Sequence, residues 1–199
     1  MRKLRCLLAT RNRGKLRELE SVLGDFGLEL STLDSLVELP DAVEDGSTFA
    51  QNARKKALHY FRLTQLPTIA DDSGLVVDAL GGRPGVHSAR FAPTDALRVE
   101  KLLRSLDSFK ERKDRKAKFV CAICFHLSDD RAIEVEAEVQ GEIGLKPRGN
   151  GGFGYDPIFY YPPLDCTFAE LSSAQKNQVS HRARALSKLK EALMTGRTG

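Results

Sequence analysis

The stretch KFVCAICFHLSDDRAIEVEAEVQGEIG, residues 118–144, decides the fold that this sequence predicts. Residues 118–128 and 132–144 each alternate in polarity and are rich in β-branched and aromatic side chains, a pattern typical of strands. Asp129 and Asp130 lie between the two runs and suit a turn. We therefore expect a long antiparallel hairpin here.

Outward from the hairpin, extended and helical patterns alternate along the N-terminal half of the chain. We expect strands at 4–10, 28–33 and 66–72, with further extended chain at 74–80, and helices at about 15–26, 48–63 and 95–106. Another helix, at the C-terminus, carries Leu186, Leu189 and Leu193 at helical spacing. This order predicts an α/β or mixed α+β fold, in which helices flank a long mixed sheet.

The bulk composition fits one globular domain. The chain has 199 residues, 41% of them hydrophobic, enough for one buried core or for two lobes that share a cleft. With 31 basic and 27 acidic side chains the net charge is +4, which mildly favours anionic partners. No signal peptide opens the chain and no apolar run reaches the ~20 residues of a membrane span. We therefore expect a cytoplasmic protein without a membrane partner.

The four cysteines fall mostly in apolar stretches. Cys121 and Cys124 form a CxxC pattern by count, but on a strand two residues three positions apart point to opposite faces. Buried thiols in a reducing compartment are therefore favoured over a zinc or redox site.

The run KERKDRKAK, residues 110–118, concentrates positive charge between the third helix and the hairpin. We interpret it as a solvated, mobile segment. The alternative is a nucleic-acid-binding patch that also uses Arg11, Arg13 and Arg54, which would bind DNA or RNA with a steep dependence on salt.

The segment TRNRGKL, residues 10–16, joins a strand to a helix and comes close to a phosphate-binding loop. The N-terminus of a helix has unpaired backbone N–H groups and partial positive charge, and both favour a phosphate. Residues 11–14 would supply these amides and Lys15 a charge. Thr10 and Asn12 would add side-chain hydrogen bonds. The alternative is a turn in which Asn12 and the following glycine serve only backbone geometry.

Two acidic segments offer ligands for a metal. Glu44 lies in a loop before a helix. That helix carries three consecutive basic residues, 54–56, which spread over roughly 200° of its surface. We therefore expect any one of these three side chains to be exposed to solvent. Asp71 and Asp72 end an apolar strand, and because side chains alternate only one should face a given pocket. One of the two, together with Glu44, would suit Mg²⁺. The alternative is an aspartate that caps a turn.

The glycine-rich segment GNGGFGYDPIF, residues 149–159, suits a flat ligand. Its glycines allow close approach to the backbone, and its aromatic rings offer a stacking surface. Asp156 precedes a proline, which favours extended backbone with the carboxylate free to face a ligand.

The segment AQKNQVSHRARAL, residues 174–186, begins the C-terminal helix. Ser180 suits an N-cap, which places His181 and Arg182 in the first turn. A cation there opposes the helix dipole, so we expect Arg182 to face a ligand. For His181 the alternative is a partly buried, hydrogen-bonded residue.

Taken together, the motifs resemble those of one enzyme family. TRNRGK, EDGSTFAQNA, ADDSGL, GGRPGVHSARF, GGFGYDPIF and SHRARAL occur in the order and approximate spacing of the inosine triphosphate pyrophosphatase family, most closely its bacterial dITP/XTP pyrophosphatases. The resemblance covers residues 4–193. It implies an elongated α/β domain over 1–199, with two lobes, a central cleft and a homodimeric assembly.

The resemblance also implies an activity. The family hydrolyses dITP, ITP, XTP and dXTP to the monophosphate and pyrophosphate with Mg²⁺, which keeps these nucleotides out of DNA and RNA. The triphosphate would bind at Thr10, Arg11, Asn12, Arg13, Gly14, Lys15 and Lys56, although the two arginines fall at positions that vary in the family. Glu44 and Asp72 would bind the metal, and Asp72 would also be the general base. Ser73 would touch the substrate, and the base site would comprise Phe153, Gly154, Tyr155, Asp156, Lys176, His181 and Arg182. The rival functions are the nucleic-acid binder and a nucleotide sensor without hydrolysis.

Overall fold

The computed structural model describes residues 4–23, 27–36 and 39–195. Its sheet has the strand order β2-β1-β3-β4-β5-β6-β7. The strands are β1 (Leu4–Leu8), β2 (Leu28–Thr32), β3 (Thr68–Val77), β4 (Lys116–Ser128), β5 (Arg131–Ile143), β6 (Phe159–Tyr161) and β7 (Cys166–Thr167). β1 is parallel to β2 and β3, whereas β6 is antiparallel to β5 and β7. The mixed sheet and the β4–β5 hairpin are therefore confirmed.

The helices agree with the sequence patterns to within a few residues where the structure describes them. They are α1 (Arg13–Leu23), α2 (Phe49–Thr64), α3 (Asp95–Ser105), α4 (Ser173–Val179) and α5 (His181–Thr195). The predicted end of the first helix at Phe26 lies outside the described residues. α4 is a short helix that the sequence analysis did not predict.

The chain forms two compact units. Unit 1 comprises residues 1–72, 121–137 and 182–199, and unit 2 comprises residues 73–120 and 138–181. A single domain over residues 1–199 stays a prediction.

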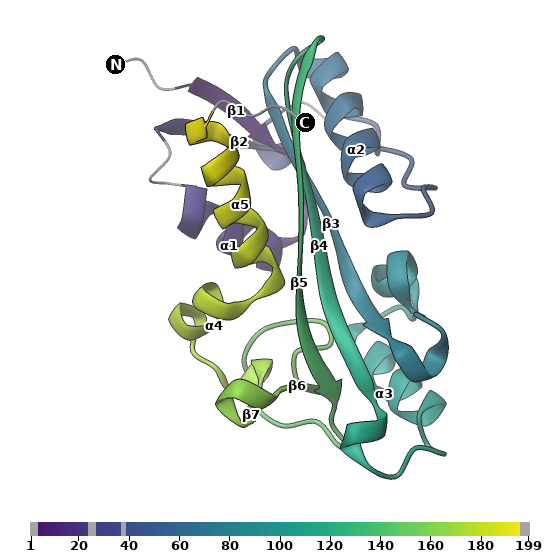
Figure 1. Cartoon of the computed structure of the whole chain (residues 1–199). Helices are drawn as coiled ribbons and strands as arrows, with labels where there is room; N and C mark the ends of the chain where they lie inside the picture. The colour runs from purple at the N-terminus through teal and green to yellow at the C-terminus, as the bar shows by residue number, and fades with distance from the viewer. Residues whose placement is uncertain (1–3, 24–26, 37–38, 196–199) are drawn as a thin grey trace. The chain divides into compact units, whose positions relative to one another are not determined.

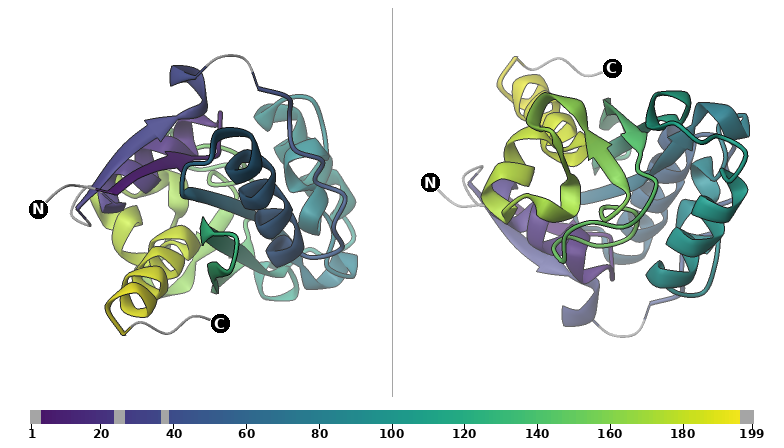
Figure 2. Two further views of the ribbon diagram at one scale, coloured as in Figure 1. Left: turned by 90° about the horizontal axis from the view of Figure 1, so that it is seen from above. Right: turned by 90° about the horizontal axis from the view of Figure 1, so that it is seen from below.

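In unit 1, helices lie on both sides of the strands. α1 and α5 lie on one side and α2 on the other (Figures 1 and 2). The core on the first side joins Leu19 of α1, Leu186 of α5 and Phe125 of β4, all with at most 1% of their surface exposed. On the second side the ring of Phe61 in α2 packs edge-on against that of His126 in β4.

In unit 2, the core gathers α3 and a cluster of aromatic rings. Leu102 and Leu106 anchor α3 and its end, and both are fully buried. Phe119 stacks near Phe159 and Phe168, with ring centroids 4.5 and 5.9 Å away. This core supports the glycine-rich segment that follows β5.

One predicted strand end is wrong. β3 continues through Asp71 and Asp72 to Val77, so the two carboxylates lie in the middle of a strand and not at its carboxyl end. Both are buried. The strand can continue because each carboxylate has a polar partner: Lys15 pairs with Asp71, and Asn52 donates to Asp72.

The basic run is mostly exposed, as predicted, but one of its cations is buried. Arg115 has only 4% of its surface exposed, and its guanidinium donates to the carbonyl oxygens of Leu106, Phe109 and Gly144 at 2.8 to 3.1 Å. A buried guanidinium needs such acceptors. Other cations of the run pair with acids: Arg112 with Glu142, Lys113 with Glu111 and Lys118 with Glu138.

The cysteines are free thiols and three are buried, as predicted. Burial raises the pKa of Cys6, Cys121 and Cys124 to about 12 each. Since only the thiolate reacts, we expect an aromatic disulfide reagent at mildly alkaline pH to label Cys166 alone in the native protein, but all four cysteines in guanidinium chloride. Rapid labelling of a second native thiol would contradict this expectation.

Among the described residues, no helix is long and apolar enough to cross a membrane.

Candidate active site

In the loop between β1 and α1, side chains of the loop itself accept its backbone N–H groups. Asn12 Oδ1 accepts the backbone N–H groups of Gly14 and Lys15 at 2.9 and 3.1 Å, and the Asn12 N–H donates to Thr10 Oγ1 at 3.2 Å. Asn12 thus acts as the N-cap of α1. These amides already have acceptors, so this part of the loop matches the backbone-geometry alternative. A phosphate role for the loop stays a prediction.

The side chain of Lys15 turns inward to a buried carboxylate. Its Nζ lies 2.9 Å from Asp71 Oδ2, and the Asp71 side chain is fully buried. Arg182, with a side chain 2% exposed, contacts Asp71 at 3.5 Å and pairs with Glu18 of α1. Burial raises the pKa of Asp71, but the cations Lys15, Arg182 and Lys56 outweigh it and hold that pKa well below its usual range.

Of the three consecutive basic residues of α2, only Lys56 is buried. Its Nζ lies 3.1 Å from Glu44 Oε1. Arg54 and Lys55 are exposed and pair with Glu134 and Asp45. The expectation of solvent exposure is therefore wrong for Lys56.

Three carboxylates surround the Lys56 ammonium. Burial lowers its pKa, but the neighbouring carboxylates outweigh burial and raise it above its ordinary value; these are Asp71, Glu44 and Asp72. Lys56 is therefore a permanent cation at neutral pH. It balances part of the negative charge around it.

Asp72 is held by a residue that the sequence analysis did not single out. Asn52 Nδ2 donates to Asp72 Oδ2 at 2.9 Å, and Asn52 Oδ1 accepts the Gly46 N–H at 2.7 Å. Burial raises the pKa of Asp72, and the nearby charge of Glu44 adds to this against the cations Lys15 and Lys56. A carboxylate with a raised pKa is better suited to accept a proton than an ordinary one.

The donor set around Asp72 fits Mg²⁺. This ion typically takes one or two carboxylates and fills its other positions with water and phosphate oxygens. Glu44 and Asp72 repel each other electrostatically, which a cation would relieve. Within residues 4–23, 27–36 and 39–195, no three His, Cys, Asp or Glu side chains gather as a metal cage.

A second group of predicted residues lies in unit 2, around the turn formed by residues 153–156, here called the Phe153 turn. Asp156 Oδ2 accepts the Phe153 N–H at 2.8 Å and the Lys176 ammonium at 2.6 Å. The ammonium also lies 4.6 Å from the centroid of the Phe153 ring. The Asp156 carboxylate therefore binds the turn and Lys176, and the expectation of a free carboxylate is wrong.

Two other predicted residues of unit 2 are packed into its core. The Tyr155 hydroxyl donates to the Ser88 carbonyl oxygen at 2.9 Å, and its ring belongs to the buried cluster. The His181 ring stacks on Phe119, with centroids 4.6 Å apart, and is 5% exposed. This matches the partly buried alternative for His181. Phe153 is left as the partly exposed aromatic ring of the turn.

The remaining predicted residues are less closely engaged. Ser73 follows Asp72 on β3 and is half-buried. Arg11 is exposed and donates to the Leu39 carbonyl oxygen at 3.2 Å, and Arg13 is exposed at the start of α1. The structure thus gathers Lys15, Lys56, Glu44, Asp72 and Arg182 in unit 1, and Phe153, Asp156 and Lys176 in unit 2.

Sequence reasoning missed Asn52 and Glu18. Asn52 lies one helical turn before Lys56, so their shared face was a usable signal. Glu18 pairs with a residue 164 positions away, and nothing local indicates that contact.

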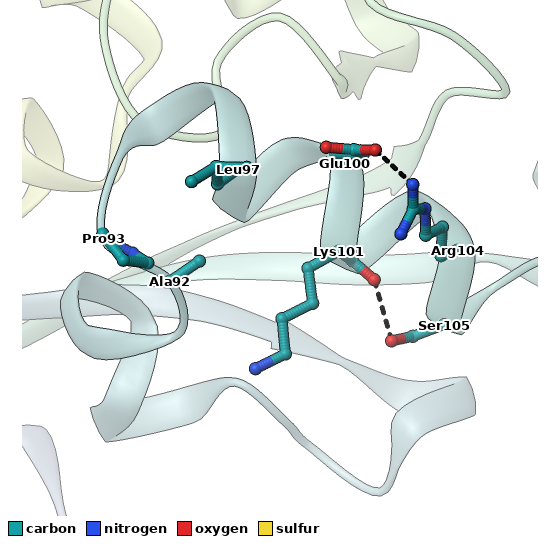
Figure 3. Close-up of a pocket in the computed structure, with 7 residues that line it drawn as sticks. All are labelled: Ala92, Pro93, Leu97, Glu100, Lys101, Arg104 and Ser105. Atoms are coloured by element: carbon teal, nitrogen blue, oxygen red, sulfur yellow. Dashed lines mark hydrogen bonds and ion pairs between the residues drawn. The ribbon is translucent and has the colours of Figure 1, made fainter.

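A shallow pocket beside α3 contains none of the predicted site residues. Its lining comprises Ala92, Pro93, Leu97, Glu100, Lys101, Arg104 and Ser105. Figure 3 shows that Glu100 and Arg104 pair with each other there, and that the Ser105 hydroxyl binds the Lys101 carbonyl oxygen.

Comparisons with known proteins agree on one family. The model of the Ham1 family matches residues 6–192. A protein of Geobacillus kaustophilus named dITP/XTP pyrophosphatase is 50% identical over 188 residues, which cover 93% of this chain and 92% of that protein. A protein of the same name from Haemophilus influenzae is 47% identical over 96% of this chain and all of its own length.

Solved structures give the same result. The structure of a HAM1 protein from Coxiella burnetii superposes with a TM-score of 0.87 at 41% identity, and the match covers 96% of this chain and 99% of that one.

Proposed function

Because the chain belongs to the Ham1 family, we propose that it hydrolyses dITP, ITP and XTP or dXTP to the nucleoside monophosphate and pyrophosphate, with Mg²⁺ as its cofactor. The names of its relatives support an enzyme of the nucleoside triphosphate pyrophosphatase class. Its role would be to cleanse the nucleotide pool. From the same resemblance we expect a homodimer in the cytoplasm.

One observation carries this proposal: two inward-facing lysines and a carboxylate with a raised pKa share one cluster. Lys15 and Lys56 pair with Asp71 and Glu44 at 2.9 and 3.1 Å, close to Asp72. When a triphosphate binds, its phosphate oxygens can replace these carboxylates as the hydrogen-bond acceptors of the two ammonium groups. The arrangement combines positive charge for a triphosphate with a base for an attacking water.

The residues of the cluster suit attack on the α-phosphorus. Lys15 and Lys56 would neutralise charge on the phosphates as pyrophosphate leaves. Asp72, oriented by Asn52, would take the proton from the attacking water. Glu44 and Asp72 would hold Mg²⁺, which supplies further charge neutralisation when bound.

Selection of the purine would rest on its 6-position. Hypoxanthine and xanthine present a keto acceptor there and an N1 donor, whereas adenine reverses both. Phe153 would stack on the base, and Lys176 of the same unit would donate to the keto oxygen. Each unpaired buried polar group costs about 1–3 kcal/mol, so two mispairings would reject ATP roughly 10²–10⁴-fold.

The test is pyrophosphate release, with and without Mg²⁺, from dITP, ITP, XTP, GTP and ATP. We expect turnover of the first three in Mg²⁺, little of ATP, and none in EDTA. If every nucleotide is inert although it binds, the nucleotide sensor is the better hypothesis. Inert nucleotides together with salt-sensitive binding of DNA or RNA would instead favour the nucleic-acid binder.

A further inference from the structure

The backbone on both sides of Phe153 is tied to a carboxylate. Its own N–H donates to Asp156 Oδ2, and the N–H of Gly154 donates to Asp95 Oδ2, both at 2.8 Å. Asp95 is the first residue of α3, 59 positions earlier in the chain. Because a peptide unit is planar, these two bonds fix the peptide planes that flank Phe153, and with them the direction of its side chain.

We propose that Asp95 is a positioning residue for the purine site, which holds the Phe153 ring in its stacking orientation through the Gly154 amide. This inference rests on the proposed function, in which Phe153 stacks on the base. It adds a residue outside the glycine-rich segment, on a different element of unit 2.

The contacts of Asp95 exceed what a helix start requires. Thr94 is already the N-cap of α3, and its hydroxyl accepts a backbone N–H of the first turn. Asp95 Oδ1 pairs with Arg98 at 2.6 Å, and Arg98 is itself anchored by the Ala92 carbonyl oxygen at 2.9 Å. With one oxygen fixed in this way, the other is aimed at Gly154.

The backbone at Gly154 shows why an external contact matters. Gly154 has a φ of 62°, a left-handed conformation that glycine adopts readily but does not itself enforce. The Asp95 carboxylate adds a restraint from outside the segment. Without it, the peptide that follows Phe153 would keep only the longer bond at its carbonyl oxygen, which accepts the Asp156 N–H at 3.2 Å, and its plane would be held less firmly.

Loss of this restraint should weaken binding and leave the chemistry intact. If the Phe153 ring is not held in place beforehand, ordering it on substrate binding costs free energy. Because this cost is the same in the ground state and in the transition state, KM rises and kcat is unchanged. Lys15, Lys56 and Asp72, which the proposed chemistry uses, belong to unit 1, whereas Asp95 belongs to unit 2.

The experiment compares Asp95→Ala with Glu100→Ala, a matched control. Glu100 is also an acidic residue of α3 paired with an arginine, but its partner is Arg104 (Figure 3). With dITP and Mg²⁺ we expect Asp95→Ala to raise KM about 3- to 10-fold with kcat within about two-fold, and Glu100→Ala to change neither. Asp95→Asn keeps an acceptor oxygen for the Gly154 N–H and should recover most of the loss.

A second measurement needs no substrate. By NMR hydrogen exchange, the Gly154 amide should be protected in the wild-type protein and in Glu100→Ala, and should exchange at least about 10-fold faster in Asp95→Ala. An unprotected Gly154 amide in the wild type would overturn the inference even if Asp95→Ala did not fold. Equal KM values for the two alanine variants would also overturn it. An inactive wild-type enzyme would overturn the proposed function and, with it, the substrate role of Asp95.

Discussion

Replacing Asp72 with asparagine is expected to reduce pyrophosphate release from dITP about 10²–10⁴-fold, because the amide cannot take a proton from the attacking water. The fold should persist. Folding raises the pKa of Asp72 through burial and Glu44, so its charged form is destabilised at neutral pH, and a neutral side chain of the same shape relieves that cost. The melting temperature of Asp72→Asn should therefore equal or slightly exceed that of the wild type.

Asp78→Asn is the control for this experiment, since Asp78 is exposed just after the end of β3. Its rate should match the wild type. A wild-type rate in Asp72→Asn would remove Asp72 from the role of base, whereas a large fall in melting temperature would assign it a structural role instead.

Replacing Arg182 with methionine is expected to lower the free energy of unfolding by about 3–5 kcal/mol, because it leaves buried carboxylate charge without its guanidinium partner. Asp71 is fully buried, and Glu18 loses its partner on α5. Urea denaturation at neutral pH measures the loss. Arg184→Met, an exposed arginine of the same helix, should change stability by less than about 0.5 kcal/mol.

The effect of Arg182→Met should depend on pH in a defined direction. The pKa of Asp71 is lowered by folding, so its stabilising contribution is present above the unfolded value of about 3.9 and is lost as the pH falls through the folded value. The difference in the free energy of unfolding between Arg182→Met and wild type should therefore become smaller in strong acid. A difference that stays constant with pH would show that the loss of packing, and not of charge pairing, dominates. Where the variant is folded, an unchanged ITP-to-ATP rate ratio would count against Arg182 as a base contact.

The sequence predicts those parts of the fold that depend on residues close together in the chain. The β4–β5 hairpin follows from alternation and its Asp129–Asp130 turn, and α1 and α2 follow from helical spacing. The motif order likewise singled out Lys15, Lys56 and Asp72, all of which the structure places in the cluster of unit 1.

The pairs that organise the site are not local, and this is why they were missed. Asp71 contacts Arg182 across 111 positions, and Asp95 contacts Gly154 across 59. Periodicity carries no information about such pairs. The same gap explains the wrong end of β3: two adjacent acids resemble a strand terminus until Lys15, Arg182 and Asn52 are known to satisfy them.

The engaged cations of the 110–118 run have a consequence for polyanions. Binding to DNA or RNA draws its free energy from counterions released as protein cations replace them, and each replaced ion steepens the salt dependence. Arg115 is buried, and Arg112, Lys113 and Lys118 are already neutralised by acids of this chain. These four cations would thus release few counterions. A plot of log affinity against log salt concentration should be shallower than the six basic residues of the run suggest.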